Sequence, residues 1–172
     1  MICLTVVSAA HSDSKRVPHA YRVARIAAFS ALSVVGSFIH PLPSLVPSVA
    51  LDSAPGFFVA LYFGPFDGFC VTGLGHVATA LINGLPLGIL HVPIALGLAV
   101  AGWVVGFVNR KWHFLPAVAA GVAINTGLVV LAIPVYGVGA TILFAPTLFL
   151  AACIDAALGT LVYLAVRRRL KA

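Results

Sequence analysis

The sequence has very few charged residues for its length. Of its 172 residues only 8% are charged, whereas 62% are hydrophobic and the mean hydropathy is +1.13. A soluble domain commonly carries charge on about a quarter of its residues, and these residues form its wetted surface. This chain cannot cover a globular surface with polar groups. The composition therefore excludes a soluble domain and predicts an integral membrane protein, with lipid covering much of its surface.

Motifs of catalysis and of metal or nucleotide binding are also missing. The cysteines Cys3, Cys70 and Cys153 lack the spacing of a metal site or a disulfide framework. We find no phosphate-cradling loop, zinc motif, paired carboxylates or serine–histidine–acid order. Thr72 with His76 is the nearest approach to a nucleophile beside a base. We therefore expect no catalytic residues, no cofactor and no metal, and any ATP hydrolysis would belong to partner chains.

The basic residues that give the chain its formal charge of +6 and its pI of about 9.7 are confined to three clusters. One precedes the first apolar segment, one separates two central segments, and one follows the last. Their members are Lys15, Arg16, Arg22 and Arg25, then Arg110 and Lys111, then Arg167, Arg168, Arg169 and Lys171. Lysine and arginine gather on the cytoplasmic side of membrane proteins. This distribution favours membrane topology over nucleic-acid binding.

Six apolar segments are separated by proline-rich, glycine-rich or basic stretches. We predict helices over residues 20–38, 51–63, 69–82, 87–108, 114–133 and 140–166. Four crossings and then two return each basic cluster to the same side, and the loops on the other side contain no lysine or arginine. The sequence thus predicts an all-α bundle of six transmembrane helices with both termini cytoplasmic. Residues 20–172 would form one domain, preceded by a cytoplasmic extension over residues 1–19.

The second segment is too short to cross a membrane. At about 1.5 Å per residue it falls well below a hydrocarbon thickness of about 30 Å. We expect Asp52 or Ser53 to cap its N-terminus and the proline-rich loop before it to fill the remaining depth. The turn over residues 64–68 follows it, and we expect Asp67 to cap that turn.

Ionisable and strongly polar side chains inside a bilayer are costly, and each is a candidate for function. We predict a ligand site from nine residues: His40, Asp52, Ser53, Phe57, His76, Asn83, His91, Asn125 and Asp155. Arginine and lysine are absent from the loops of the same side, so a phosphate or carboxylate ligand would find no counter-charge. We expect a neutral or weakly basic ligand that carries hydroxyl groups and an aromatic ring, on which Phe57 could stack.

Structural interpretations of the same residues remain open. A buried histidine satisfied by a neighbouring hydroxyl would explain His76, and a hydrogen bond between Asn125 and Asp155 would join two helices without touching a ligand. Two histidines with Asp52 could in principle bind a metal, but no pair has ligand spacing.

Several stretches resemble one family of membrane proteins. They are Ala27-Ala-Phe-Ser-Ala-Leu-Ser33, Leu51-Asp-Ser-Ala-Pro-Gly-Phe-Phe58, Leu61-Tyr-Phe-Gly-Pro-Phe-Asp-Gly68 and Gly73-Leu-Gly-His-Val-Ala-Thr-Ala80. In these stretches the chain resembles the substrate-binding S components of energy-coupling-factor (ECF) vitamin transporters. The resemblance extends to the predicted arrangement of all six helices. Residues 50–56, Gly75-His76 and Gly84-Leu-Pro-Leu-Gly88 are most similar to the α-ribazole branch, which salvages a cobalamin precursor.

The resemblance implies a mechanism and partners. S components bind a vitamin-like ligand at the extracellular side, under a loop that here contains Pro41, Pro43, Leu45 and Pro47. They dock on a transmembrane coupling subunit that carries two ATPases. The small-residue motif of the first helix, which makes this contact in the family, corresponds here to Ala24, Ala27, Ala28 and Ala31. The alternative from the residues alone is a stand-alone secondary transporter or channel, in which His76 and Asp155 would relay protons.

Overall fold

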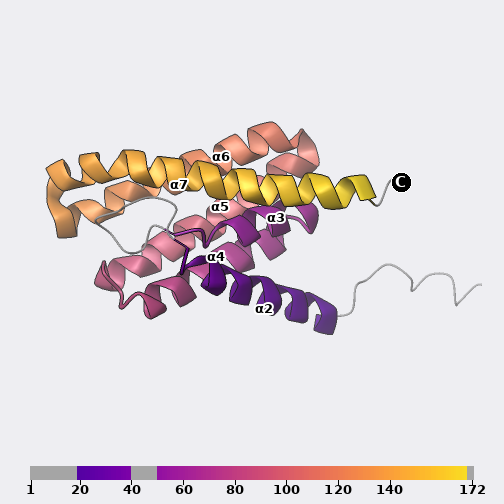
Figure 1. The fold of residues 1–172 in the computed structure, drawn as a ribbon, viewed down its shortest axis with the longest axis horizontal. Helices are drawn as coiled ribbons and strands as arrows, with labels where there is room; N and C mark the ends of the chain where they lie inside the picture. Colours follow the sequence, from indigo (N-terminus) through magenta and orange to yellow (C-terminus); the bar gives the residue numbers. More distant parts are fainter. Residues whose placement is uncertain (1–18, 40–49, 170–172) are drawn as a thin grey trace, which may run out of the picture.

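The computed structural model describes residues 19–39 and 50–169, and all regular structure in these stretches is helical. Six α-helices are labelled in Figure 1, and two short 3-10 helices precede α5 and α7. The elements are α2 (His19–Gly36), α3 (Ala54–Tyr62), α4 (Pro65–Ile82), η1 (Gly88–Leu90), α5 (His91–Lys111), α6 (Phe114–Gly127), η2 (Leu128–Ala132) and α7 (Ile133–Arg169).

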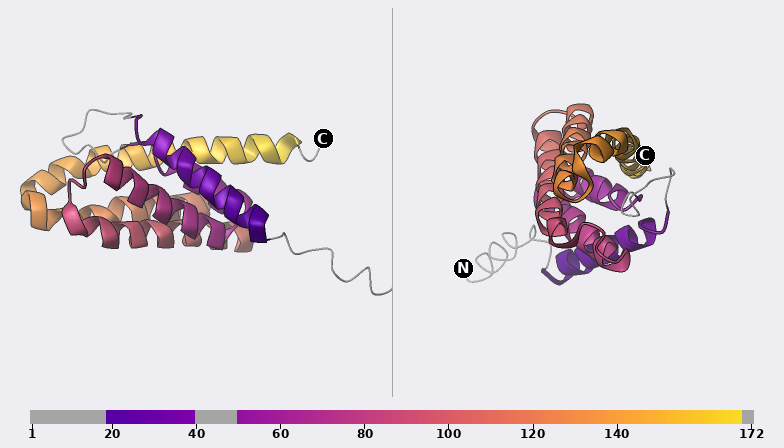
Figure 2. Two further views of the ribbon diagram at one scale, coloured as in Figure 1. Left: turned by 90° about the horizontal axis from the view of Figure 1, so that it is seen from below. Right: turned by 90° about the vertical axis from the view of Figure 1, so that its left-hand side faces the viewer.

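The short helix α3 forms the centre of the bundle. It contacts α2, α4, α5, α6 and α7, which surround it in the ribbon views (Figures 1 and 2). Every residue from Gly56 to Leu61 is buried. Phe57, Phe58, Val59 and Ala60 belong to the main hydrophobic core. Burial of this apolar helix against the other helices explains how a helix of only nine residues persists.

Helices α4 and α5 pack closely through small residues. A Cβ atom on Gly102 would meet the carbonyl of Gly68, so the two backbones touch where neither helix carries a side chain. Beside this contact the Thr72 hydroxyl lies 2.8 Å from the carbonyl oxygen of Gly68 and 2.9 Å from that of Leu98 on α5. Small residues and a hydroxyl–carbonyl bond are the usual means of joining helices in lipid.

The beginning of α2, the end of α5 and the end of α7 lie at one end of the bundle, which we call the basic end (Figures 1 and 2). There Arg22 Nε lies 2.6 Å from Asp67 Oδ1, and Arg25 pairs with the other oxygen of the same carboxylate. Arg110 donates to the Phe63 carbonyl over 2.9 Å. These contacts connect α2, the α3–α4 turn and α5.

The structure corrects the predicted role of Asp67. Helix α4 begins at Pro65 rather than at residue 69, its N-cap position is Gly64, and no side chain caps it. Proline suits a first helical turn because its missing N–H needs no partner there. Asp67 therefore lies inside the first turn, where its carboxylate binds two arginines instead of the turn backbone.

The boundaries of the last two predicted segments also shift. Helix α6 ends at Gly127, and η2 occupies the part of the predicted fifth helix that follows. Helix α7 then starts at Ile133 and is broken at Gly137, whose φ of 77° is accessible to glycine without strain. The break falls in the gap between the predicted segments 114–133 and 140–166.

The exterior of the described helices is strongly apolar. Leu143 is 75% exposed, Ile89 81% and Leu161 63%, which water would penalise and lipid would not. By length and hydropathy, two helical stretches of the described chain qualify as candidate membrane spans, Gly88–Lys111 and Phe114–Arg169. The number of crossings and the orientation of the termini stay predictions.

Candidate functional site

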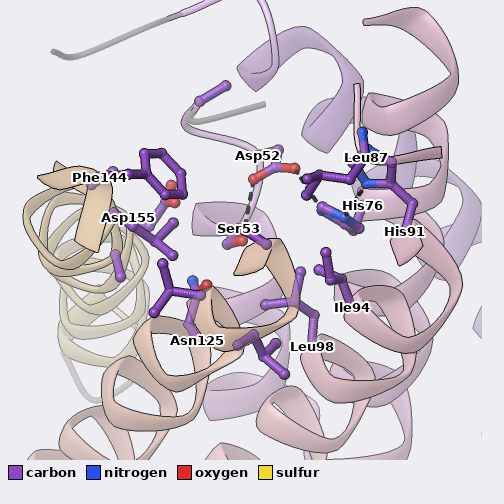
Figure 3. Close-up of a pocket in the computed structure, with 17 residues that line it drawn as sticks. Asp52, Ser53, His76, Leu87, His91, Ile94, Leu98, Asn125, Phe144 and Asp155 are labelled. Carbon is purple, nitrogen blue, oxygen red and sulfur yellow. Dashed lines mark hydrogen bonds and ion pairs between the residues drawn. The ribbon is translucent and has the colours of Figure 1, made fainter. Parts of the chain in front are cut away.

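A cavity of about 60 Å³ lies between the segment that precedes α3 and helices α4, α5, α6 and α7 (Figure 3). Its polar lining residues are Asp52, Ser53, His76, His91, Asn125 and Asp155, and among its apolar ones are Leu87, Ile94, Leu98, Leu128, Phe144 and Leu148. The structure thus brings six of the nine predicted site residues together from five parts of the chain.

One side of the cavity is acidic. Asp155 Oδ1 on α7 accepts a hydrogen bond from the backbone N–H of Ala54 over 3.0 Å, and Asp155 is only 2% exposed. The first N–H groups of a helix have no partner within the helix, so this carboxylate supplies one from a distant element. Asp155, and not Asp52 or Ser53, therefore caps α3, where Ser53 occupies the N-cap position without a capping side-chain bond.

Asp52, which lines the cavity, has one carboxylate oxygen without a hydrogen-bond partner. Its Oδ1 accepts a hydrogen bond from the Ser53 hydroxyl over 3.2 Å. Its Oδ2 is buried and has no hydrogen-bond partner, with His76 Nδ1 3.7 Å away. A buried carboxylate oxygen without a partner carries a desolvation penalty that a hydrogen-bond donor from a ligand would relieve.

The opposite side holds a pair of histidines. His76 Nε2 on α4 lies 3.2 Å from His91 Nδ1 at the start of α5, and His91 Nε2 accepts from the backbone N–H of Leu87 over 3.3 Å. The interpretation of His76 as a residue satisfied by a neighbouring hydroxyl is therefore wrong, because its partner is another imidazole. The described residues contain no group of three potential ligands placed to hold a metal ion.

Asn125 and the apolar residues form the floor (Figure 3). Within the described stretches no hydrogen bond joins Asn125 to Asp155, so the predicted bond between these two residues is absent; Asp155 binds the start of α3 instead. Phe144 borders the cavity from α7 and supplies an aromatic surface there.

Two predicted residues lie elsewhere. Phe57 is 4% exposed in the core and borders only a smaller neighbouring cavity, because α3 turns it away from the main one. Asn83 caps the C-terminus of α4 and does not line the cavity. His40 and the loop residues Pro41, Pro43, Leu45 and Pro47 lie outside the described residues.

The cavity has no cationic side chain among its described lining residues, although it contains two aspartates. Arginines 22, 25 and 110 are held at the basic end by Asp67 and by the Phe63 carbonyl. An anionic ligand would meet like charge in a low dielectric. The site suits a ligand that donates hydrogen bonds and presents an apolar face.

Sequence reasoning missed the backbone of Leu87 and the apolar floor around Leu98, Leu128 and Leu148. Apolar residues are so common in this sequence that nothing distinguishes those that line a cavity. The Leu87 N–H points at His91 only because η1 and its preceding turn bring the two together, and no side-chain pattern records that turn.

The four alanines of the predicted interface are all exposed on α2. The opposite face of this helix packs inward through Ile26 and Phe29, and Ser33 lies against Gly75 of α4. No other described part of the chain covers the alanine face, so this face can approach another protein.

The bundle has an apolar exterior and encloses a cavity lined by aspartate, histidine and apolar side chains. These two features are typical of a membrane protein that binds a small molecule. The chain belongs to the family of the ECF transporter, substrate-specific component, whose family model matches residues 21–167. Members of this family are substrate-binding subunits in the membrane that act with coupling and ATPase subunits, and they are not enzymes. Comparison with curated proteins and with solved structures gives no significant match.

The environment of Thr72 agrees with a protein that is not an enzyme. Its hydroxyl lies within hydrogen-bond distance of three backbone carbonyls, and no hydrogen bond joins it to His76 within the described residues. It therefore has the environment of a helix-joining residue and not that of a nucleophile beside a base.

Proposed function

We propose that this chain captures a vitamin precursor for an ATP-driven importer, and that its ligand is an aromatic nucleoside of the α-ribazole type, neutral or weakly basic. The observation that carries this proposal is the cavity itself, which presents Asp52, Asp155 and the histidine pair above an apolar floor and has no lysine or arginine among its described lining residues. Ribose hydroxyls match the acceptors, and a flat base matches Phe144 and the leucines.

The arrangement of basic residues supports the proposed topology. All three basic clusters have members at the basic end, where Arg22 and Arg25 share Asp67 and where Arg167 lies 3.2 Å from the Tyr163 hydroxyl. We infer that this end is cytoplasmic, with both termini, and that the cavity opens toward the exterior.

Titration calorimetry of the purified chain with α-ribazole tests the ligand. We expect a nanomolar dissociation constant, roughly 12 kcal/mol of binding free energy. Asp52→Asn should weaken binding about tenfold to hundredfold, because it replaces a charged acceptor by a neutral amide. Thr160→Val, which changes a polar residue of α7 outside the cavity, should leave the affinity unchanged. Absence of binding by the wild-type chain would overturn the α-ribazole assignment.

The alanine face of α2 is proposed to contact the coupling subunit. Ala27→Trp should abolish copurification with that subunit and ATP-dependent uptake, because the large ring prevents close helix approach. Calorimetric affinity for α-ribazole should stay within about twofold, since α2 does not line the cavity. Ala119→Trp, at an exposed alanine of α6, is the matched control and should retain assembly. Uptake driven by a pH gradient in vesicles that contain only this chain would instead identify a secondary transporter.

A further inference from the structure

One face of α5 carries a row of exposed side chains that is apolar over most of its length and ends on a cation. Side chains three or four residues apart share one face of a helix. The apolar members of the row are between 38% and 59% exposed, and its cation is exposed in the last turn of α5, at the basic end. Because no other described part of the chain covers these side chains, lipid surrounds them. We call this row the α5 stripe; it consists of Leu96, Val100, Trp103, Phe107 and Lys111.

The last three members of the α5 stripe are stacked on one another. The ring centroids of Trp103 and Phe107 lie 4.9 Å apart at an interplanar angle of 10°. Lys111 Nζ lies 5.0 Å from the centroid of the Phe107 ring. A cation over an aromatic face is attracted by the ring quadrupole, and a lysine stem can cover apolar surface while its head stays among polar groups. The stacking thus holds the ammonium group at the end of the apolar row.

The ammonium group of Lys111 has no anionic partner in the described stretches. The one carboxylate of the basic end there is Asp67, which already pairs with Arg22 and Arg25. Arg110 is hydrogen-bonded to a backbone carbonyl. Lys111 forms neither an ion pair nor a side-chain hydrogen bond with a described residue, although an ammonium group has three donors. An acceptor for Lys111 must therefore come from outside this part of the chain.

We propose that the α5 stripe binds an anionic phospholipid, whose phosphate lies on Lys111 and whose acyl chain lies along the apolar side chains of the stripe. The phosphate supplies the acceptor that the ammonium group lacks. At about 1.5 Å per residue, the helix rises about 22 Å from Leu96 to Lys111, which exceeds half of a hydrocarbon thickness of about 30 Å. An acyl chain of one leaflet can thus lie against the stripe over its full depth, whereas a soluble anion would use Lys111 alone.

The chain has two tryptophans, and both lie in this part of the surface. Trp103 belongs to the α5 stripe, and Trp112, which is 75% exposed, directly follows Lys111. Tryptophan and lysine gather where the hydrocarbon of a membrane meets the headgroups, so their presence here agrees with Lys111 at the level of the phosphates. The intrinsic fluorescence of the chain therefore reports on the lipid that occupies this site.

Quenching of this fluorescence by lipids with brominated acyl chains tests the proposal. Trp112→Phe leaves Trp103 as the single tryptophan, in vesicles that mix phosphatidylglycerol and phosphatidylcholine with bromine on one lipid or the other. We expect phosphatidylglycerol to be preferred at the site about fivefold, which corresponds to the about 1 kcal/mol of one basic residue near an anionic surface. Equal quenching by the two lipids would overturn the proposal.

Charge variants separate a site on α5 from a diffuse attraction to the basic end. In the Trp112→Phe background, Lys111→Gln should abolish the preference for phosphatidylglycerol, and Lys111→Arg should retain it. Arg169→Gln removes the same charge from the exposed end of α7 and is the matched control, which should also retain the preference. Equal losses in Lys111→Gln and Arg169→Gln would show that the whole basic end attracts anionic lipid, and would overturn the assignment to the α5 stripe.

Inorganic phosphate distinguishes a lipid headgroup from a soluble anion. Added in place of chloride at constant ionic strength, it should not relieve the quenching by brominated phosphatidylglycerol, because it has no acyl chain to place on the stripe. Relief by phosphate would identify a site for a soluble anion and overturn the proposal. These measurements contain no α-ribazole, and both leaflets of the vesicles have the same composition. Their failure would therefore leave the proposed function and topology standing, and failure of α-ribazole binding would leave the lipid site standing.

Discussion

Asp67→Ala is expected to lower the apparent melting temperature of the chain in detergent by roughly 5–15 °C. Asp67 is 1% exposed and receives both Arg22 and Arg25, so alanine leaves two guanidinium groups without their acceptor. Removal of one partner of a buried ion pair costs about 3–5 kcal/mol. Because the Arg22 side chain is 39% exposed and can turn to solvent or headgroups, we expect about 2–4 kcal/mol here.

The controls separate this pairing from a general effect of charge at the basic end. Arg169→Ala removes a charge from the exposed end of α7 and should shift the melting temperature by no more than a degree or so. Arg25→Ala combined with Asp67→Ala should cost less than the sum of the single changes, because both remove the same interaction. Additive costs, or an unchanged melting temperature in Asp67→Ala, would show that the pair does not hold α2.

Asp155→Ala is expected to reduce ligand affinity about 30- to 100-fold and to destabilise the fold. The variant leaves the Ala54 N–H without its acceptor at the start of α3, which costs about 1–3 kcal/mol. Asp52 and Ser53 directly precede that helix turn, so its loosening displaces the acidic side of the cavity. A displacement that costs about 2–3 kcal/mol of binding corresponds to the stated loss of affinity. Calorimetry with α-ribazole and thermal unfolding in detergent measure the two effects.

Asp155→Asn is the matched variant, because its amide oxygen can still accept from Ala54. We expect it to recover most of the stability. If affinity is then also recovered, Asp155 acts by holding α3; if only stability is recovered, the carboxylate contacts the ligand as well. Asp155→Ala with unchanged stability and affinity would contradict the capping role.

The polar lining of the cavity was predictable because polar groups are rare in this sequence. In an apolar segment a lone Asp52, His76 or Asp155 must face protein or a cavity, since lipid offers no hydrogen bonds. The same reasoning wrongly placed Phe57 in the cavity, because an aromatic ring is equally stable in a hydrophobic core and in a ligand site.

The partners of these residues were not predictable. Helices α6 and α7 are apolar on nearly every face, so their sequences do not state which side turns inward. The pairing of Asn125 with Asp155 was a reasonable expectation, but the rotation of α7 aims Asp155 at the start of α3. In the same way, the rotation of α2 lets Arg22 and Arg25 reach Asp67. Arg22 and Asp67 are 45 residues apart in the sequence.

The sequence by itself determined an all-helical chain with an apolar exterior, basic residues in three clusters, and a small set of polar residues that lipid could not host. Solvation energy decides all of these, and solvation depends on residue type. Tertiary structure alone decided that Asp155 caps α3, that Leu87 orients His91, and that Asp52 keeps a free oxygen. Those outcomes depend on distances of a few ångströms between helices, which a uniformly apolar sequence leaves open.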